Sequence, residues 1–301
     1  MTISRAQLAK ELEPGLNALF GLEYDRYEDE AAEIFESESS DRAFEEEVML
    51  SGFGTAPVKS EGSAISFDDA QETYTARYTM ETIALAFSIT EEAVEDNLYD
   101  SLAKRYTRAL ARSMSQTKQI KGATVMNNAF STGSPIGDGA ALCSAAHPSL
   151  SGSQTNLLAT AADLNETSLE EILIQIAGFT DERGLKIAVR GTKLLIPKEL
   201  QFIAERIINS NLRPGTADND INAMKSMGML PEGAVVNHFF TDADAFFVKT
   251  DCPNGFKLFN RTPLKTAMEG DFDTGNMRFK ARERYSFGVS DWRCVFGTPG
   301  A

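Results

Sequence analysis

Residues 72–121 read ETYTARYTMETIALAFSITEEAVEDNLYDSLAKRYTRALARSMSQTKQIK and decide the fold, because an extended ribbon passes directly into one long helix. Up to Met80, apolar and polar side chains alternate, with Tyr74 and Tyr78 on the apolar face. This period is typical of a half-buried strand. At Glu81 the alternation slips by one residue, which predicts a β-bulge where a projecting loop enters a packed body.

The helix is expected to begin at Thr90, a residue type suited to the N-cap. Apolar side chains then recur about every fourth residue, at Val94, Leu98, Leu102, Tyr106, Leu110 and Met114. Gly122 is the first residue that weakens a helix. About 30 residues at about 1.5 Å each predict a rod of about 45 Å.

The segment before the helix is predicted to be a β-hairpin from Gly52 to Ser88 that turns at residues 59–62. An isolated two-stranded ribbon is only marginally stable in water. Neither the hairpin nor the helix carries enough apolar surface to fold alone, so we expect something outside the chain to cover them.

Composition bounds the class of protein. The chain has 301 residues, 42% of them hydrophobic, which suffices for one large domain or two ordinary ones. No run of 18 apolar residues occurs and the N-terminus is polar, so folding in a cytoplasm is expected, without export. The three cysteines show no C-x-x-C spacing and are expected to be reduced thiols.

The net charge of −15 is unevenly distributed. Residues 1–100 contain 24 acidic and 6 basic residues, whereas residues 101–162 contain one acidic and six basic residues. The acidic arm and the basic rod are either solvated faces or partners that pair between copies. The overall charge argues against a dedicated duplex-DNA binder, while weak contact with packaged nucleic acid stays open.

Beyond the helix, residues 131–162 are rich in Gly, Ser, Ala and Thr and are expected to form a connector. An α/β block follows, with a capping box formed by Ser168 and Glu171. Strands are expected at 194–196, 235–236, 245–249, 256–259, 277–281 and 287–289. The predicted fold class is therefore α+β.

Catalytic chemistry is expected to be absent. Cys143 and His147 form a C-x-x-x-H pair, but Pro148 and the surrounding composition favour a turn over a nucleophile–base pair. Two acidic clusters, beginning at Asp218 and Asp271, imitate calcium loops but lack the glutamate required at position twelve. No phosphate-binding glycine loop is present. The prediction is a protein without enzyme activity, metal or cofactor.

Lys59 allows one specific hypothesis. At the tip of a projecting hairpin it could reach an asparagine of a neighbouring copy and form an isopeptide bond. The alternative is a solvated turn lysine that keeps a strand edge soluble.

The order of these elements resembles the major capsid protein of tailed bacteriophages, which has the Hong Kong 97-type fold, over nearly the whole chain. Residues 141–148, ALCSAAHP, followed by Gly152 and Asn156, look like the segment after the spine helix in the Mu-like major head subunit group. Arg282-x-Arg284-Tyr285-x-Phe287-Gly288 with Trp292 resembles its closing sheet.

The resemblance implies an N-terminal arm at residues 1–48 and an extended hairpin, the E-loop, at 49–89. It implies a peripheral domain at 90–163 and 259–301 with the long spine helix, and an inserted axial domain at 164–258. Because the sequence reaches its arm at once, a separate scaffolding protein or prior processing is expected. Contacts between subunits are expected at Lys59, Tyr74, Arg77, Tyr78, Glu28, Glu45, Glu46, Arg105, Arg108 and Arg112.

The function implied is a structural subunit that self-assembles as pentamers and hexamers into an icosahedral shell around double-stranded DNA. The implied partners are further copies of the chain, a scaffolding protein, a portal protein and DNA that is contacted weakly. Decoration proteins are a possible further partner. No membrane is involved. Such a subunit assembles in the bacterial cytoplasm and resides in the virion. Two alternatives stay open: an encapsulin-type compartment of the same fold, and an enzyme that uses Cys143 and His147.

Overall fold

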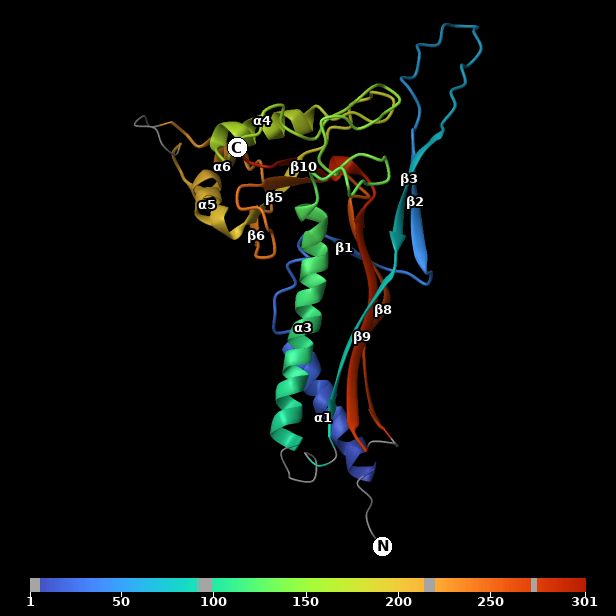
Figure 1. Ribbon diagram of the computed structural model, residues 1–301. Coiled ribbons are helices and arrows are strands. Elements are labelled where there is room, and N and C mark those ends of the chain that lie inside the picture. The colour runs from blue at the N-terminus through green and yellow to red at the C-terminus, as the bar shows by residue number, and fades with distance from the viewer. Residues whose placement is uncertain (1–5, 91, 93–98, 214–219, 272–274) are drawn as a thin grey trace.

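A computed structural model of the protein describes residues 6–90, 92, 99–213, 220–271 and 275–301. Two four-stranded sheets, a separate two-stranded hairpin and the helices that cover the sheets make up this part of the chain (Figure 1). The hairpin and its loop extend to one side of the molecule, away from the helices. The mixed helix and sheet content confirms the predicted α+β class.

The first sheet has the order β1-β8-β9-β4. Its strands are β1 (Glu36–Ser39), β4 (Glu81–Ile89), β8 (Phe256–Gly270) and β9 (Met277–Val289). β1 runs parallel to β8, and the other pairs are antiparallel. The terminal alternations expected as two short strands, 277–281 and 287–289, form the single strand β9.

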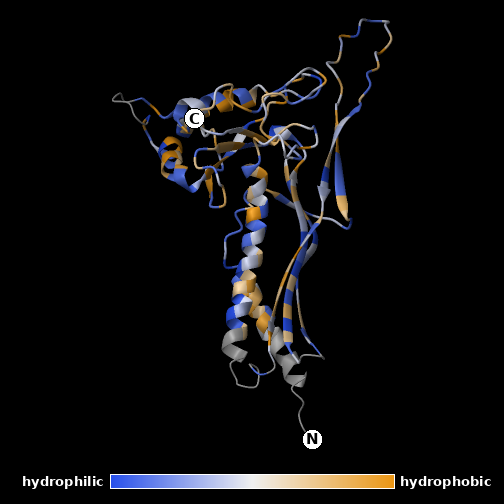
Figure 2. Ribbon diagram, viewed as in Figure 1, coloured by the Kyte–Doolittle hydropathy of each residue, from blue (hydrophilic) through white to orange (hydrophobic). Residues whose placement is uncertain are grey.

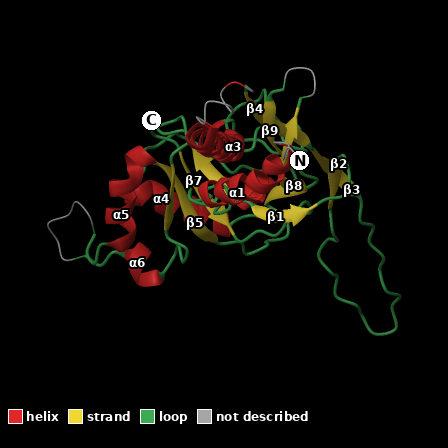
Figure 3. Ribbon diagram, turned by 90° about the horizontal axis from the view of Figure 1, so that it is seen from below, coloured by secondary structure: helices red, strands yellow, loops and turns green. Residues whose placement is uncertain are grey.

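Helix α3 (Tyr99–Asn127), the predicted spine, covers one face of this sheet together with α1 (Ala6–Tyr24). Seen from below in Figure 3, α1 and α3 lie on the same side of the sheet. Leu110 and Met114 of the predicted apolar row are buried in one cluster with Phe20 of α1 and with Phe279 of β9. The spine is confirmed, at 29 residues, whereas the predicted start at Thr90 falls next to residues outside the described part.

Gly122 does not end the spine helix, which continues to Asn127. A Cβ atom at residue 122 would lie 3.0 Å from the Cβ of Ala31 and 3.4 Å from the ring of Phe287. The glycine therefore lets the N-terminal segment pack closely on the helix. Its helix-weakening effect is outweighed by tertiary packing.

The hairpin differs from its prediction in one strand. β3 (Glu72–Thr79) is the expected returning strand, but its partner is β2 (Phe44–Leu50), and residues 51–71 form a long loop without strands. The outgoing strand therefore precedes Gly52 instead of following it. At the predicted slip, the chain leaves the hairpin at Met80 and enters the first sheet as β4, so the change of register separates two strands.

The second sheet has the order β10-β7-β5-β6, formed by β5 (Gly191–Pro197), β6 (Ala234–Asn237), β7 (Phe246–Thr250) and β10 (Val295–Thr298). Helices α4 (Glu166–Ala177), α5 (Gln201–Asn209) and α6 (Ala223–Met227) flank it, with short 3-10 turns at Lys198–Leu200 and Trp292–Cys294. The expected capping box is present one turn earlier, because Asn165 is the N-cap and Ser168 its N3 partner. The C-terminal strand β10 joins this sheet, beside β7. The bounds of the predicted peripheral and axial domains stay a prediction.

Figure 2 shows the hydropathy pattern that holds these layers together, with polar and apolar residues alternating along β9. Phe279 and Ala281 point to the helices and are buried, whereas Arg278, Lys280 and Arg282 are exposed on the other face. One side of the sheet is thus covered by helices, and the other faces solvent over much of its length.

Candidate functional site: the hairpin, the spine helix and a buried junction

The base of the hairpin is covered by this chain's own first sheet. Ala76, Tyr78 and Met80 are buried with Phe259, and the rings of Tyr78 and Phe259 meet edge-on with centroids 4.8 Å apart. The hydroxyl of Tyr78 hydrogen-bonds to Ser290. Burial raises the pKa of the Tyr78 phenol. The expectation that another molecule covers this apolar face is therefore wrong for the base of the hairpin.

A glycine and a lysine fix the hairpin on the sheet. A Cβ atom at Gly288 would lie 2.6 Å from the Tyr78 ring, so only glycine permits this approach. Beside it, the buried Nζ of Lys257 lies 3.2 Å from a carboxylate oxygen of Glu38 and also contacts Glu47 of β2. A buried cation thus joins the hairpin to strand β1.

The loop at residues 51–71 carries apolar side chains in solvent. Val58 is 98% exposed and Phe67 is 95% exposed, and Phe53 and Ile65 are exposed as well. Near the body the loop is closed by a hydrogen bond from the Gly54 amide to Asp68, 2.7 Å long. Exposed apolar groups gathered on a projecting loop are typical of a surface that binds a partner.

The predicted contact residues of the hairpin and arm are partly engaged within the chain. Arg77 and Glu46 form an ion pair across the hairpin strands at 3.7 Å, and Glu45 accepts a hydrogen bond from Ser40 at 2.6 Å. Tyr78 has little surface left to offer a neighbour, whereas Lys59 and Glu28 are exposed. Tyr74 is half-buried, and its hydroxyl has no hydrogen-bond partner among the described residues.

The spine helix uses its basic residues in two ways. Towards its C-terminal end, Lys118 pairs with Asp29 at 3.1 Å and Lys121 with Glu81 at 2.6 Å, both within the chain. Further towards the N-terminal end, the remaining bases of the prediction, Arg105, Arg108 and Arg112, are exposed. Pairing of the acidic arm with the rod therefore occurs inside one copy at Asp29, whereas Lys121 pairs with the first residue of β4, and pairing between copies stays a prediction.

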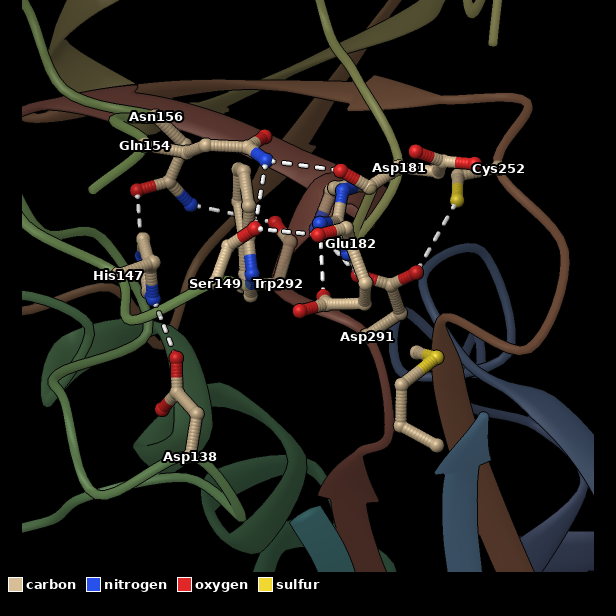
Figure 4. A network of polar contacts seen from close by, with 12 residues as sticks. Asp138, His147, Ser149, Gln154, Asn156, Asp181, Glu182, Cys252, Asp291 and Trp292 are labelled. Atoms are coloured by element: carbon tan, nitrogen blue, oxygen red, sulfur yellow. Dashed lines mark hydrogen bonds and ion pairs between the residues drawn. The ribbon is translucent and has the colours of Figure 1, made fainter. Parts of the chain in front are cut away.

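A buried junction lies where the connector meets the second sheet (Figure 4). His147 is fully buried, with Nδ1 2.6 Å from a carboxylate oxygen of Asp138 and Nε2 3.0 Å from Oδ1 of Asn156. The Asn156 amide nitrogen donates to the carbonyls of Leu142 and Val295, which directs its oxygen toward the imidazole. His147 Nε2 therefore donates a hydrogen bond to Oδ1 of Asn156.

The indole of Trp292 connects this histidine to an ionic cluster. The His147 and Trp292 rings are stacked with centroids 4.4 Å apart, and the guanidinium carbon of Arg293 lies 4.3 Å from the indole centroid. Arg293 pairs with Glu182 at 2.8 Å and with Asp291 at 3.2 Å, all three being buried. Removing one member of such a buried ionic set is costly, because it leaves a partner unpaired.

The geometry does not bring Cys143 and His147 together for catalysis. The imidazole is occupied by Asp138 and Asn156, and burial raises the pKa of the Cys143 thiol well above its ordinary value. A neutral thiol is a poor nucleophile. The arrangement ties the connector to the C-terminal strands instead of forming a reactive pair.

Asp138, Glu182 and Arg293 were not singled out from the sequence. The segment from Cys143 to Asn156 was the part of the sequence that pointed to this junction, because it contains a histidine and an asparagine in a polar loop. Its partners, however, lie as far as 139 residues away in sequence, as for Asn156 and Val295. No local sequence pattern predicts a contact between residues so far apart in the chain.

Metal binding has no support in the described residues, where no group of three His, Cys, Asp or Glu side chains could hold an ion. Asn222 of the first calcium-like cluster instead caps helix α6. Asp218 and Asp273 of the two clusters lie outside the described residues. Among the described helices, none is long and apolar enough to span a bilayer.

The fold and these surfaces define a shell-forming structural protein of the capsid class. Residues 73–297 match the model of the phage capsid protein family, three quarters of the chain, and the chain belongs to this family. The resemblance to tailed-phage major capsid proteins is thereby confirmed, and the likeness to the Mu-like group stays a prediction. No curated protein sequence matches the chain.

Solved capsid structures share its fold. The capsid of an empty GTA particle has a TM-score of 0.60 at 13% identity, with 91% of this chain and 90% of that chain covered. The capsid of Myoviridae phage XM1 has a TM-score of 0.53 at 11% identity and 89% coverage of both chains. A virus-like particle from Pyrococcus furiosus has a TM-score of 0.54 at 8% identity, covering 94% and 97%.

The chain is therefore a capsid shell protein with the Hong Kong 97-type fold, and its family places it in the virion as a homo-oligomer. It is a structural protein and not an enzyme, as its sequence suggested.

Proposed function

We propose that this chain is the major capsid protein of a tailed-phage head, whose copies form pentamers and hexamers of an icosahedral shell around double-stranded DNA. The observation that most supports this proposal is the loop at residues 51–71, which projects from the body with its apolar side chains in solvent. The base of the same hairpin is anchored by Tyr78 and Lys257. An anchored base with an uncovered tip fits an element that binds the next subunit.

Each copy that gives a hairpin and receives one makes at least two contacts, so weak contacts suffice for a stable assembly. The predicted division into arm, hairpin, peripheral and axial domains belongs to this proposal. So do a scaffolding protein, a portal protein and assembly in the host cytoplasm.

The test removes the apolar character of the loop without touching its anchored base. In the variant F53S/V58S/I65S/F67S we expect a folded subunit that no longer forms shells, because all four side chains are exposed in the single chain. The matched control, S60A/S66A, changes two polar residues of the same loop and is expected to assemble normally. Shells of unchanged yield from the first variant would contradict the proposal.

The contents of wild-type shells distinguish a phage head from a protein compartment of the same fold. Nuclease-protected double-stranded DNA within shells isolated from infected or induced cells is the result expected for a phage head. A packaged protein and no nucleic acid would favour a compartment of the same fold.

A further inference from the structure

A notch lies between the C-terminal end of α1 and the exposed face of the spine helix. It has a volume of about 340 Å³ and is lined by Glu23, Tyr27, Arg108, Ala109, Arg112, Ser113 and Gln116. Except for Glu23 and Ala109, these residues offer hydrogen-bond donors: two guanidinium groups, two hydroxyl groups and an amide. The notch is thus rich in donors on an otherwise acidic protein.

The charge of the notch is positive. Its single carboxylate, Glu23, pairs with Arg26 at 3.5 Å, which offsets its negative charge. Arg108 and Arg112 are four residues apart, so their side chains project from the same face of the helix, about 6 Å apart along its axis. Arg105 extends this exposed basic face one turn towards the helix N-terminus.

The chemistry of the notch selects the ligand. Guanidinium groups bind phosphate oxygens through paired hydrogen bonds, and hydroxyl and amide groups commonly add contacts to a nucleic-acid backbone. The notch is an open surface depression, and besides its polar groups it is lined by the ring of Tyr27 and the methyl group of Ala109. Its two guanidinium groups therefore favour a backbone phosphate as the ligand.

We propose that this notch, centred on Arg108 and Arg112, contacts backbone phosphates of the double-stranded DNA that the shell encloses. The inference rests on the proposed function, because it needs DNA inside the shell, and it assigns the helical side of the subunit to the interior. The contact is independent of base sequence. Many copies face the same DNA, so each copy needs only the affinity typical of non-specific DNA contacts, a Kd of about 10⁻⁴ to 10⁻⁶ M, which a single chain still shows.

The opposite face of the subunit offers a matched control. Lys280 and Arg282 are exposed on β9, on the side of the sheet that faces away from the helices. The variants R108E/R112E and K280E/R282E change the net charge equally and differ only in the face they alter. The variant R108Q/R112Q removes the charges of the notch without adding repulsion against Glu23.

The experiment measures the binding of the unassembled full-length chain to a fluorescent duplex of about 30 base pairs over a salt series. For R108E/R112E we expect at least about tenfold weaker binding at about 0.1 M salt, and a salt slope smaller by about two, one for each lost phosphate contact. R108Q/R112Q should give the same change of slope, and K280E/R282E less than about threefold weakening. Two unrelated duplex sequences should bind alike, and inorganic phosphate should compete only at high concentration.

Three results would overturn the assignment: no DNA binding by the wild-type chain, equal loss in both charge-reversal variants, or normal DNA binding by both notch variants. If the last were accompanied by lost assembly, the notch would be a contact between subunits. Because the formation of wild-type shells is measured separately, failure of the notch and failure of the proposed shell function are distinguishable.

Discussion

Replacing Glu283 by glutamine should stabilise the subunit above neutral pH. Glu283 lies on the row of β9 that faces the helices, between the buried residues Ala281 and Tyr285. Its Oε2 accepts a 3.4 Å hydrogen bond from Tyr24 of α1, and its Oε1 has no hydrogen-bond partner among the described residues. An ionised carboxylate is poorly solvated there.

Burial is the main cause that raises the pKa of Glu283 from 4.5 to about 7. Lys118 and the hydroxyl of Tyr24 lower the pKa, and Asp29 raises it. Because the folded chain holds this proton more tightly than the unfolded chain, stability is fully present below pH 4.5 and is lost as the pH rises to about 7. At 1.36 kcal/mol per pKa unit, the loss is about 3 kcal/mol.

Urea unfolding of the unassembled chain at pH 5 and pH 8 measures this effect. We expect E283Q to exceed the wild type by about 2–3 kcal/mol at pH 8 and to lie within about 1 kcal/mol of it at pH 5. The exposed Glu269 supplies the control, since E269Q should leave the pH dependence unchanged. Equal pH dependence of wild type and E283Q would refute the reasoning.

Three further outcomes are expected. G288A should cost about 1–3 kcal/mol in urea unfolding, because its methyl group meets the Tyr78 ring, and wild-type stability in this variant would argue against the docked hairpin base. N156A should cost about 3 kcal/mol, since buried carbonyls and His147 lose their partner; a change below about 1 kcal/mol would contradict the junction. We expect Lys59 to stay an unlinked surface lysine, so denaturing gels of assembled material should show one band near 33 kDa, and a ladder above it would reveal cross-linking.

The sequence predicted elements whose signals are local. The four-residue spacing of Leu110 and Met114 and the two-residue spacing of Ala76 and Tyr78 each record which face is buried. These periods survive in the structure as the spine helix and β3. The order of elements along the chain then sufficed for the resemblance to capsid proteins.

The predictions that the structure corrects failed for one physical reason: each depended on a contact between segments that are distant in the sequence. The outgoing strand of the hairpin was predicted to follow Gly52, whereas β3 pairs with residues 44–50, three of which are glutamates. Likewise Tyr78 was expected to need a neighbour, although Phe259 covers it from 181 positions further along the chain. Helix α1 was not predicted, and its buried residue Phe20 packs on Phe279.

Electron microscopy of the purified wild-type protein, negatively stained at several concentrations, most directly tests whether this chain builds a shell. We expect closed particles of uniform size above a threshold concentration, in coexistence with free subunits. A population that consists only of single compact molecules at every concentration, under conditions that preserve the fold, would contradict the account.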